Sequence, residues 1–185
     1  MSTLVANQIV SPTGNVILDQ SGSIIQAVVA RTDTQTTYTA PLNSTGVSIA
    51  ALPISITPKQ STSLLIISFH LMYEVDETTV FRILRDGSVM TASGYESYNP
   101  GIGQAIYNGL QAANYDSANN NTTTPSHTKL MMYDSASGGA RTYTASVGGS
   151  NTATNTFYLN RSGSNPGTNG NEVGVSFAKI LEVAQ

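Results

Sequence analysis

The sequence predicts an all-β protein, an antiparallel, jelly-roll-like β-sandwich preceded by an extended N-terminal arm. Large apolar residues alternate with smaller or polar ones in many short runs, which is the pattern of half-buried strands. Clusters of Gly, Asn and Ser bound these runs, and Val, Ile, Leu and Thr supply much of their bulk. Seven or more short strands at this spacing are typical of a sandwich or a jelly roll.

Residues 1–23 form the expected arm. Their short apolar pieces are separated by turn signals around Pro12, Gly14 and Gly22, so none of them is long enough to bury itself. We therefore expect the arm to lie on its own domain or on a neighbouring chain, with a frayed terminus as the alternative. The residues expected to make this contact are Leu4, Val5, Ile9, Val10, Val16, Ile17 and Leu18.

The β-domain is expected to span residues 24–185, with its central core strand near the middle of the chain. One face of that strand carries Leu65, Ile67, Phe69, Leu71, Tyr73 and Val75. The opposite face, from Leu64 to Glu74, is too apolar for open water and too polar for a second core. We expect Ile66, His70 and Met72 on this face to pack against another subunit or a second sheet.

Further strands follow the same alternation, and Asp86-Gly87 is a strong two-residue hairpin signal at the end of one of them. The expected strands lie at Leu52–Ile56, Phe81–Ile83, Leu130–Met132, Tyr143–Val147, Phe157–Leu159 and Val173–Val183.

Residues 94–125 are expected to form a long loop insertion, with one hairpin at Asn108-Gly109. A short helix over Gln104–Asn114 is the main alternative. Four tyrosines lie in this region among Gly, Ser and Asn, a mixture typical of binding loops. These rings either bind a receptor or a glycan or hold the loop against its own domain, and both interpretations stay open. They are Tyr95, Tyr98, Tyr107 and Tyr115.

Composition argues against catalysis. Ser, Thr, Asn and Gly make up 76 of 185 residues, while Cys and Trp are absent and only two histidines occur. We interpret His70 and His127 as structural, and Glu74, Asp76 and Glu77 as a solvated strand end rather than a calcium or magnesium site. The sequence therefore predicts no enzyme, no metal and no cofactor.

Charge and hydropathy narrow the expected partners. A net charge of −3 with no basic cluster argues against nucleic acid. No apolar run reaches the length of a signal peptide core or a membrane span, so we expect neither a standard secretion signal nor a membrane partner.

Several segments resemble the β-sandwich virion structural and tail-fibre proteins of aquatic tailed phages. The resemblance lies in Tyr133-Asp-Ser-Ala-Ser, Arg141-Thr-Tyr-Thr-Ala-Ser-Val, Thr156-Phe-Tyr-Leu-Asn-Arg-Ser162 and Val175-Ser-Phe-Ala-Lys-Ile-Leu-Glu-Val. The opening residues and Phe81-Arg-Ile-Leu-Arg-Asp-Gly are also similar, whereas the insertion from Gly94 to Pro125 has no counterpart.

This resemblance implies a non-enzymatic homotrimer located in the virion, whose N-terminal segment attaches to other capsid or tail proteins. Full-length fibres generally need a long shaft, whereas this chain reads as an arm and one domain. We therefore expect a capsid decoration or cement protein. The alternative is a tail-fibre or tail-tip component that binds a host receptor or surface glycan through the Tyr-rich loop.

Overall fold

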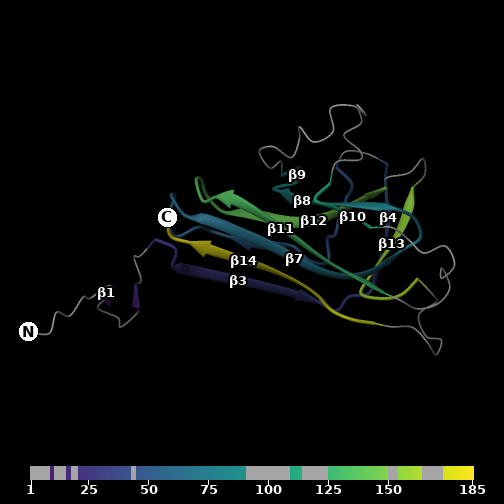
Figure 1. Cartoon of the computed structure of the whole chain (residues 1–185), viewed down its shortest axis with the longest axis horizontal. Helices are drawn as coiled ribbons and strands as arrows, with labels where there is room; N and C mark the ends of the chain where they lie inside the picture. The colour runs from purple at the N-terminus through teal and green to yellow at the C-terminus, as the bar shows by residue number, and fades with distance from the viewer. Residues whose placement is uncertain are drawn as a thin grey trace, which may run out of the picture.

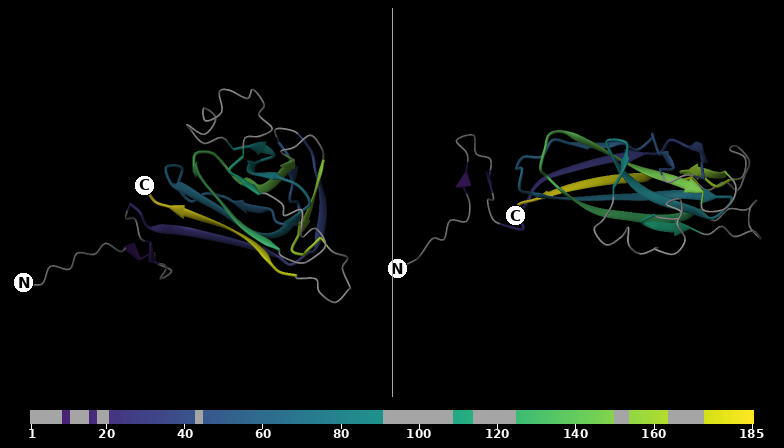
Figure 2. Two further views of the ribbon diagram at one scale, coloured as in Figure 1. Left: turned by 45° about the vertical axis from the view of Figure 1, so that its right-hand side comes forward. Right: turned by 90° about the horizontal axis from the view of Figure 1, so that it is seen from above.

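A computed structural model describes residues 9–10, 16–17, 21–42, 45–90, 109–113, 125–149, 154–163 and 173–185. These residues form two antiparallel sheets packed face to face, which confirms the predicted all-β sandwich (Figures 1 and 2). Across the described ranges there is no helix, and hence none long and apolar enough to cross a membrane.

The first sheet, called here the β8 sheet, has the order β10-β8-β12-β5, with β6 also paired to β12 and β9 to β8. Its strands are β5 (Val47–Ser48), β6 (Ile54–Ile56), β8 (Thr79–Arg85), β9 (Ser88–Val89), β10 (Gln111–Ala113) and β12 (Arg141–Gly149).

The second sheet, called the β7 sheet, has the order β3-β14-β7-β13-β4, with β11 also paired to β7. Its strands are β3 (Ile24–Thr32), β4 (Thr36–Ala40), β7 (Leu64–Val75), β11 (Ser126–Ser135), β13 (Asn155–Leu159) and β14 (Ser176–Val183). Residues 64–70 of β7 pair with both β14 and β11, so these two strands lie on opposite edges of β7.

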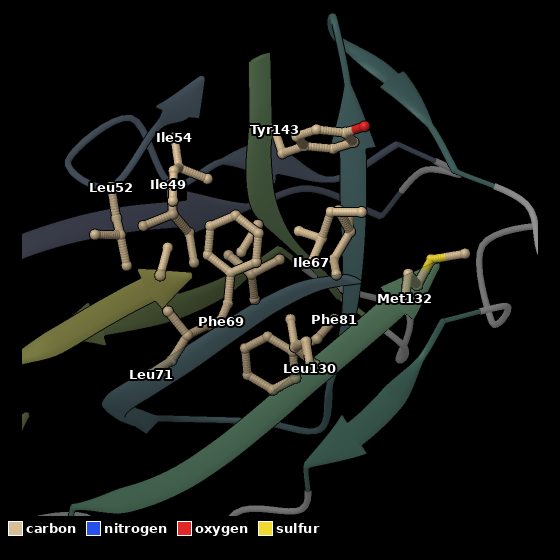
Figure 3. Packing of buried hydrophobic residues seen from close by; sticks show 14 of the residues in the cluster. Ile49, Leu52, Ile54, Ile67, Phe69, Leu71, Phe81, Leu130, Met132 and Tyr143 are labelled. Carbon is tan, nitrogen blue, oxygen red and sulfur yellow. The ribbon is translucent and has the colours of Figure 1, made fainter. Parts of the chain in front are cut away.

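Strand β7 is the central core strand, as predicted. All six of its expected inward residues are at most 8% exposed. They pack against inward residues of β8 and β12 from the other sheet, including Ile83 and the Phe81 and Tyr143 labelled in Figure 3. The Tyr73 ring lies 4.9 Å from Phe81 and 5.4 Å from Phe157, centroid to centroid, so aromatic contacts join the two sheets.

The hairpin predicted at Asp86-Gly87 is confirmed. Leu84 pairs with Val89 and Arg85 with Ser88, which leaves two residues in the turn. Their φ angles are 50° and 82°, as a type I′ turn requires.

The described part of the arm is a minimal hairpin. β1 (Ile9–Val10) pairs with β2 (Val16–Ile17), and this hairpin lies outside the sandwich in Figure 1. The Gly22 amide donates to the carbonyl of Ala184, and the Ala184 amide donates to that of Ser23, so the chain is fixed beside its C-terminal residues just before β3 begins. Leu4, Val5 and Leu18 lie outside the described residues.

The insertion returns one strand to the body of the protein. β10 pairs antiparallel with β8, with Ala112 opposite Val80. Residues 111–113 are therefore extended, and the helix considered for Gln104–Asn114 is wrong at these positions. Asn108 lies outside the described residues, so the expected hairpin at Asn108-Gly109 stays a prediction.

An open apolar face as the candidate functional site

The candidate site is the outer face of the β7 sheet, on the side away from the β8 sheet. Side chains alternate between the two faces of a strand, so the pairing register of β3, β14, β7 and β11 defines rows of neighbours on this face. The first three rows are Ile24-Val183-Leu64-Ser135, Ala27-Leu181-Ile66-Tyr133 and Val29-Lys179-Ser68-Met131. The fourth, called here the cationic row, is Arg31-Phe177-His70-Lys129.

This outer face exposes large apolar side chains. Ile24, Val29, Met131, Tyr133 and Phe177 are between 42% and 68% exposed. With strands about 4.8 Å apart and alternate residues about 6.7 Å apart, four strands by four rows cover roughly 500 Å². Ten of the sixteen positions are apolar, so the apolar part is roughly 300 Å², and apolar patches of this size on a monomer are often functional.

The outer side of the β8 sheet differs, because the outward side chains of β8 are covered by other parts of the chain. Val80, Arg82 and Leu84 point away from the core but are almost fully buried. Gly109 lies directly against Val80, and a Cβ added at Gly109 would overlap that side chain. The Leu110 amide also donates to the carbonyl of Phe81. Along these strands, the open apolar surface therefore belongs to the β7 sheet.

The structure brings two of the three predicted interface residues onto this face. Ile66 and His70 are half-buried and lie in its second and fourth rows. The expectation for Met72 is wrong, because that side chain is only 4% exposed. Gly174, shortly before β14, lies against it, and a Cβ added at Gly174 would overlap the Met72 sulfur. Its own chain covers Met72, which leaves no surface for a partner.

The charged side chains of the four rows are all cationic. Arg31, Lys129 and Lys179 are exposed, and the His70 ring stacks on Phe177 with centroids 4.4 Å apart and planes 14° apart. Burial lowers the pKa of His70, and the nearby Lys129 and Lys179 lower it further. His70 therefore stays neutral at pH 7 and keeps an N–H donor on the face.

The two histidines lie on adjacent strands, but they are not part of an evident metal site. His127 pairs with Met72, so it is two positions along β11 from Lys129, the partner of His70. Among the described residues, no group of three or more His, Cys, Asp or Glu side chains is placed to hold a metal ion.

Two carboxylates at the end of β7 accept hydrogen bonds from backbone amides. Glu74 accepts a hydrogen bond from the Gly163 amide at 2.5 Å. Asp76 accepts one from the Thr156 amide at 2.6 Å. These bonds give both residues a structural role at the strand end where a solvated carboxylate cluster was expected.

A polar network of hydrogen bonds and ion pairs lies at one end of the core and was not predicted from the sequence. The Asp134 carboxylate accepts hydrogen bonds from the Tyr143 hydroxyl at 2.7 Å, from Arg85 Nη1 at 2.9 Å and from Arg141 Nη1 at 3.1 Å. Arg141 also donates to the carbonyls of Ser135, at 2.6 Å, and Ser137. The network ties together β8, β11 and β12.

This network sets the ionisation of its members. Burial by itself raises the pKa of Asp134, but the hydrogen bonds from Tyr143, Arg85 and Arg141 and the positive charge of Arg85 more than offset it, so the pKa is lowered overall. Burial and the same Asp134 contact raise the pKa of Tyr143. Asp134 is therefore ionised and Tyr143 neutral at physiological pH.

A second buried carboxylate fixes the connection between β6 and β7. Glu182 is fully buried, and its two oxygens accept the Lys59 amide at 2.8 and 2.9 Å and the Gln60 amide at 2.9 Å. The alternation of side chains between the two faces of a strand was the sequence signal that could have predicted both buried carboxylates. Asp134 shares its face with Leu130 and Met132, and Glu182 shares its face with Ile180, so each had to point inward and needed partners.

The four tyrosines proposed for receptor binding, Tyr95, Tyr98, Tyr107 and Tyr115, lie outside the described residues, so their role stays a prediction. Searches of family models and of curated proteins find no match to this chain.

Proposed function

We propose that this chain is a non-enzymatic structural component of a tailed-phage particle. In this proposal the β-domain forms a homotrimer through the outer face of the β7 sheet, and the N-terminal arm attaches the trimer to other virion proteins. The role we favour is capsid decoration or cementing. The observation that carries the proposal is the open apolar face, since the comparable side of the β8 sheet is closed along β8.

Self-association would remove this apolar surface from water. At about 25 cal/mol per Å², covering the roughly 300 Å² of apolar surface on each copy is worth about 7 kcal/mol before the cost of association. A standard interface buries about 800 Å² per partner, somewhat more than this face offers in one contact. In a closed ring each copy makes two contacts through different patches, so a trimer would add further surface to what this face buries.

The trimer is tested by placing a charge on the face without disturbing the fold. Val29 is 68% exposed, so Val29→Lys costs little in the folded monomer. In the trimer it would bury a further unpaired cation next to Lys179, which pairs with Val29 across β3 and β14. Ser88→Lys, in the exposed β9 hairpin, adds the same charge elsewhere as a matched control.

We expect sedimentation equilibrium to give a trimer for the wild type and for Ser88→Lys at micromolar concentration. We expect Val29→Lys to be a monomer with the circular dichroism and melting temperature of a folded domain. A monomeric wild type would refute self-association, and a trimeric Val29→Lys would move the interface off this face.

Attachment to the particle is tested with the arm. The deletion should stop at residue 20, because Gly22 and Ser23 are hydrogen-bonded to Ala184 in the body of the domain. We expect the shortened protein to fold and trimerise but to be missing from purified particles. Its presence at the wild-type copy number would show that the β-domain is the anchor. In wild-type particles, a copy number that scales with the capsid lattice supports decoration, and a few copies per particle support a tail location.

A further inference from the structure

The charged side chains of the outer face are all positive, and they lie close together. The cationic row runs straight across the four strands, with Arg31 at one end, Lys129 at the other and His70 beside Lys129. Lys179 lies one row away and is close enough to His70 to lower its pKa. Given the spacing of neighbouring strands, the row is roughly 14 Å long.

No carboxylate lies in the four rows to neutralise these cations. The nearest acidic side chain on the same face of β7 is Glu74, which pairs across the sheet with Tyr158 and accepts the Gly163 amide. Asp134 and Glu182 belong to these strands but point into the protein, where they hold Arg141 and the backbone of Lys59. The positive charge of the face therefore lacks an internal counterpart within the described rows.

This arrangement matters if the proposed trimer forms through the face, and the inference rests on that proposal. Cyclic symmetry brings the same row from every copy around one axis. Three cations per copy would then meet in partly desolvated surroundings, where unpaired charge is costly. A multivalent anion bound among them would remove this cost and accept hydrogen bonds from the lysine and arginine groups.

We propose that the outer face is an anion-linked interface, in which a polyvalent oxyanion of the sulfate or phosphate type binds between copies among Arg31, Lys129 and Lys179. The neutral His70 ring, held flat against Phe177, supplies a further N–H donor. The anion is a ligand of the assembly, and the isolated copy holds only a part of its site.

The test is sedimentation equilibrium of the full chain in chloride buffer, with and without millimolar sulfate at matched ionic strength. We expect sulfate to raise the trimer association constant by roughly 5- to 150-fold, the usual size of the coupling between two ligands. The double variant Lys129→Gln/Lys179→Gln should associate more tightly than wild type in chloride and should lose the response to sulfate. Lys59→Gln, which removes an exposed lysine from the β6–β7 connection, should behave like wild type.

The comparison between variants separates anion binding from the general strengthening of apolar contacts by sulfate, because that effect acts on all of them. A wild type that is monomeric in every buffer would refute the trimer itself. A trimer that is equally stable with and without sulfate would overturn only the anion link. Weaker association of the double variant in chloride would also overturn it, since the lysines would then be paired with carboxylates of the neighbouring copy. Asp33, an exposed residue just after β3 and two residues beyond Arg31, is a candidate for this pairing.

Discussion

Replacing Asp134 by Asn tests the buried network that joins β8, β11 and β12. The substitution keeps the shape of the side chain and leaves an oxygen that can still accept the Tyr143 hydroxyl. It removes the charge that Arg85 and Arg141 face. The expected result is a large loss of stability that comes almost entirely from one of these two arginines.

Exposure decides which arginine dominates. In the pair with Arg85 the arginine side chain is 48% exposed, and such pairs contribute less than about 1 kcal/mol. The pair with Arg141 has side-chain exposures of 6% and 9%, and removing one partner of a buried pair costs about 3–5 kcal/mol. For a domain of this size, that loss lowers the melting temperature by roughly 10 °C.

The pH dependence adds a second readout. The folded-state pKa of Asp134 is lowered relative to its value in the unfolded chain. The stabilisation is therefore present above about pH 4 and is lost as the pH falls through the folded-state pKa. Asp134→Asn should weaken this acid-induced loss as well as lower the overall stability.

Urea denaturation at pH 7 and at pH 3 measures both effects, with Arg85→Gln as the control that removes only the exposed half of the network. We expect Arg85→Gln to lose less than about 1 kcal/mol. The reasoning fails if Asp134→Asn stays within about 1 kcal/mol of wild type at pH 7, or if the two variants are equally destabilised.

Three further predictions concern the fold. Gly46→Ala should destabilise the protein by about 1–3 kcal/mol in urea denaturation, because Gly46 has φ +74° and the new Cβ would lie 2.7 Å from the Val147 carbonyl oxygen. The control Gly87→Asn, in an open turn, should be nearly neutral. Burial raises the pKa of Tyr73 to about 12, while an unfolded tyrosine ionises near 10, so the free energy of unfolding should fall between these pH values. Tyr73→Phe should make this fall with pH less steep, and an unchanged steepness would contradict the prediction. EDTA should leave the melting temperature unchanged, and a drop would point back to the carboxylates at the end of β7.

Strand periodicity predicted the parts of the fold in which large apolar residues occupy alternate positions. This pattern holds for β7, for Leu130 and Met132 in β11 and for Tyr143 to Val147 in β12, and each of these three predicted strands is present. β4 was missed because its sequence is TTYTA, in which Tyr38 is the one large apolar side chain. β10 was missed because its three residues, QAA, carry no alternation, and pairing with β8 places them in the sheet.

The candidate face was only partly predictable for a related reason. The mixed character of the outer side of β7 suggested a covered surface at Ile66 and His70. The neighbouring contributions of Val29, Met131 and Tyr133 depend on which strands flank β7, and that order comes from long-range pairing. The covering of Met72 likewise depends on a connection more than a hundred residues away in the chain, at Gly174.

The most direct test of self-association through this face uses the absence of cysteine from the chain. Val29→Cys places a single thiol in the third row of the face, and Ser88→Cys places one in the β9 hairpin. The rate of modification by a thiol reagent is then measured against protein concentration. We predict that the Val29→Cys thiol becomes protected over the concentration range in which the trimer forms, while the Ser88→Cys thiol reacts at a constant rate. A Val29→Cys thiol that reacts equally fast in monomer and trimer would show that copies associate through another surface.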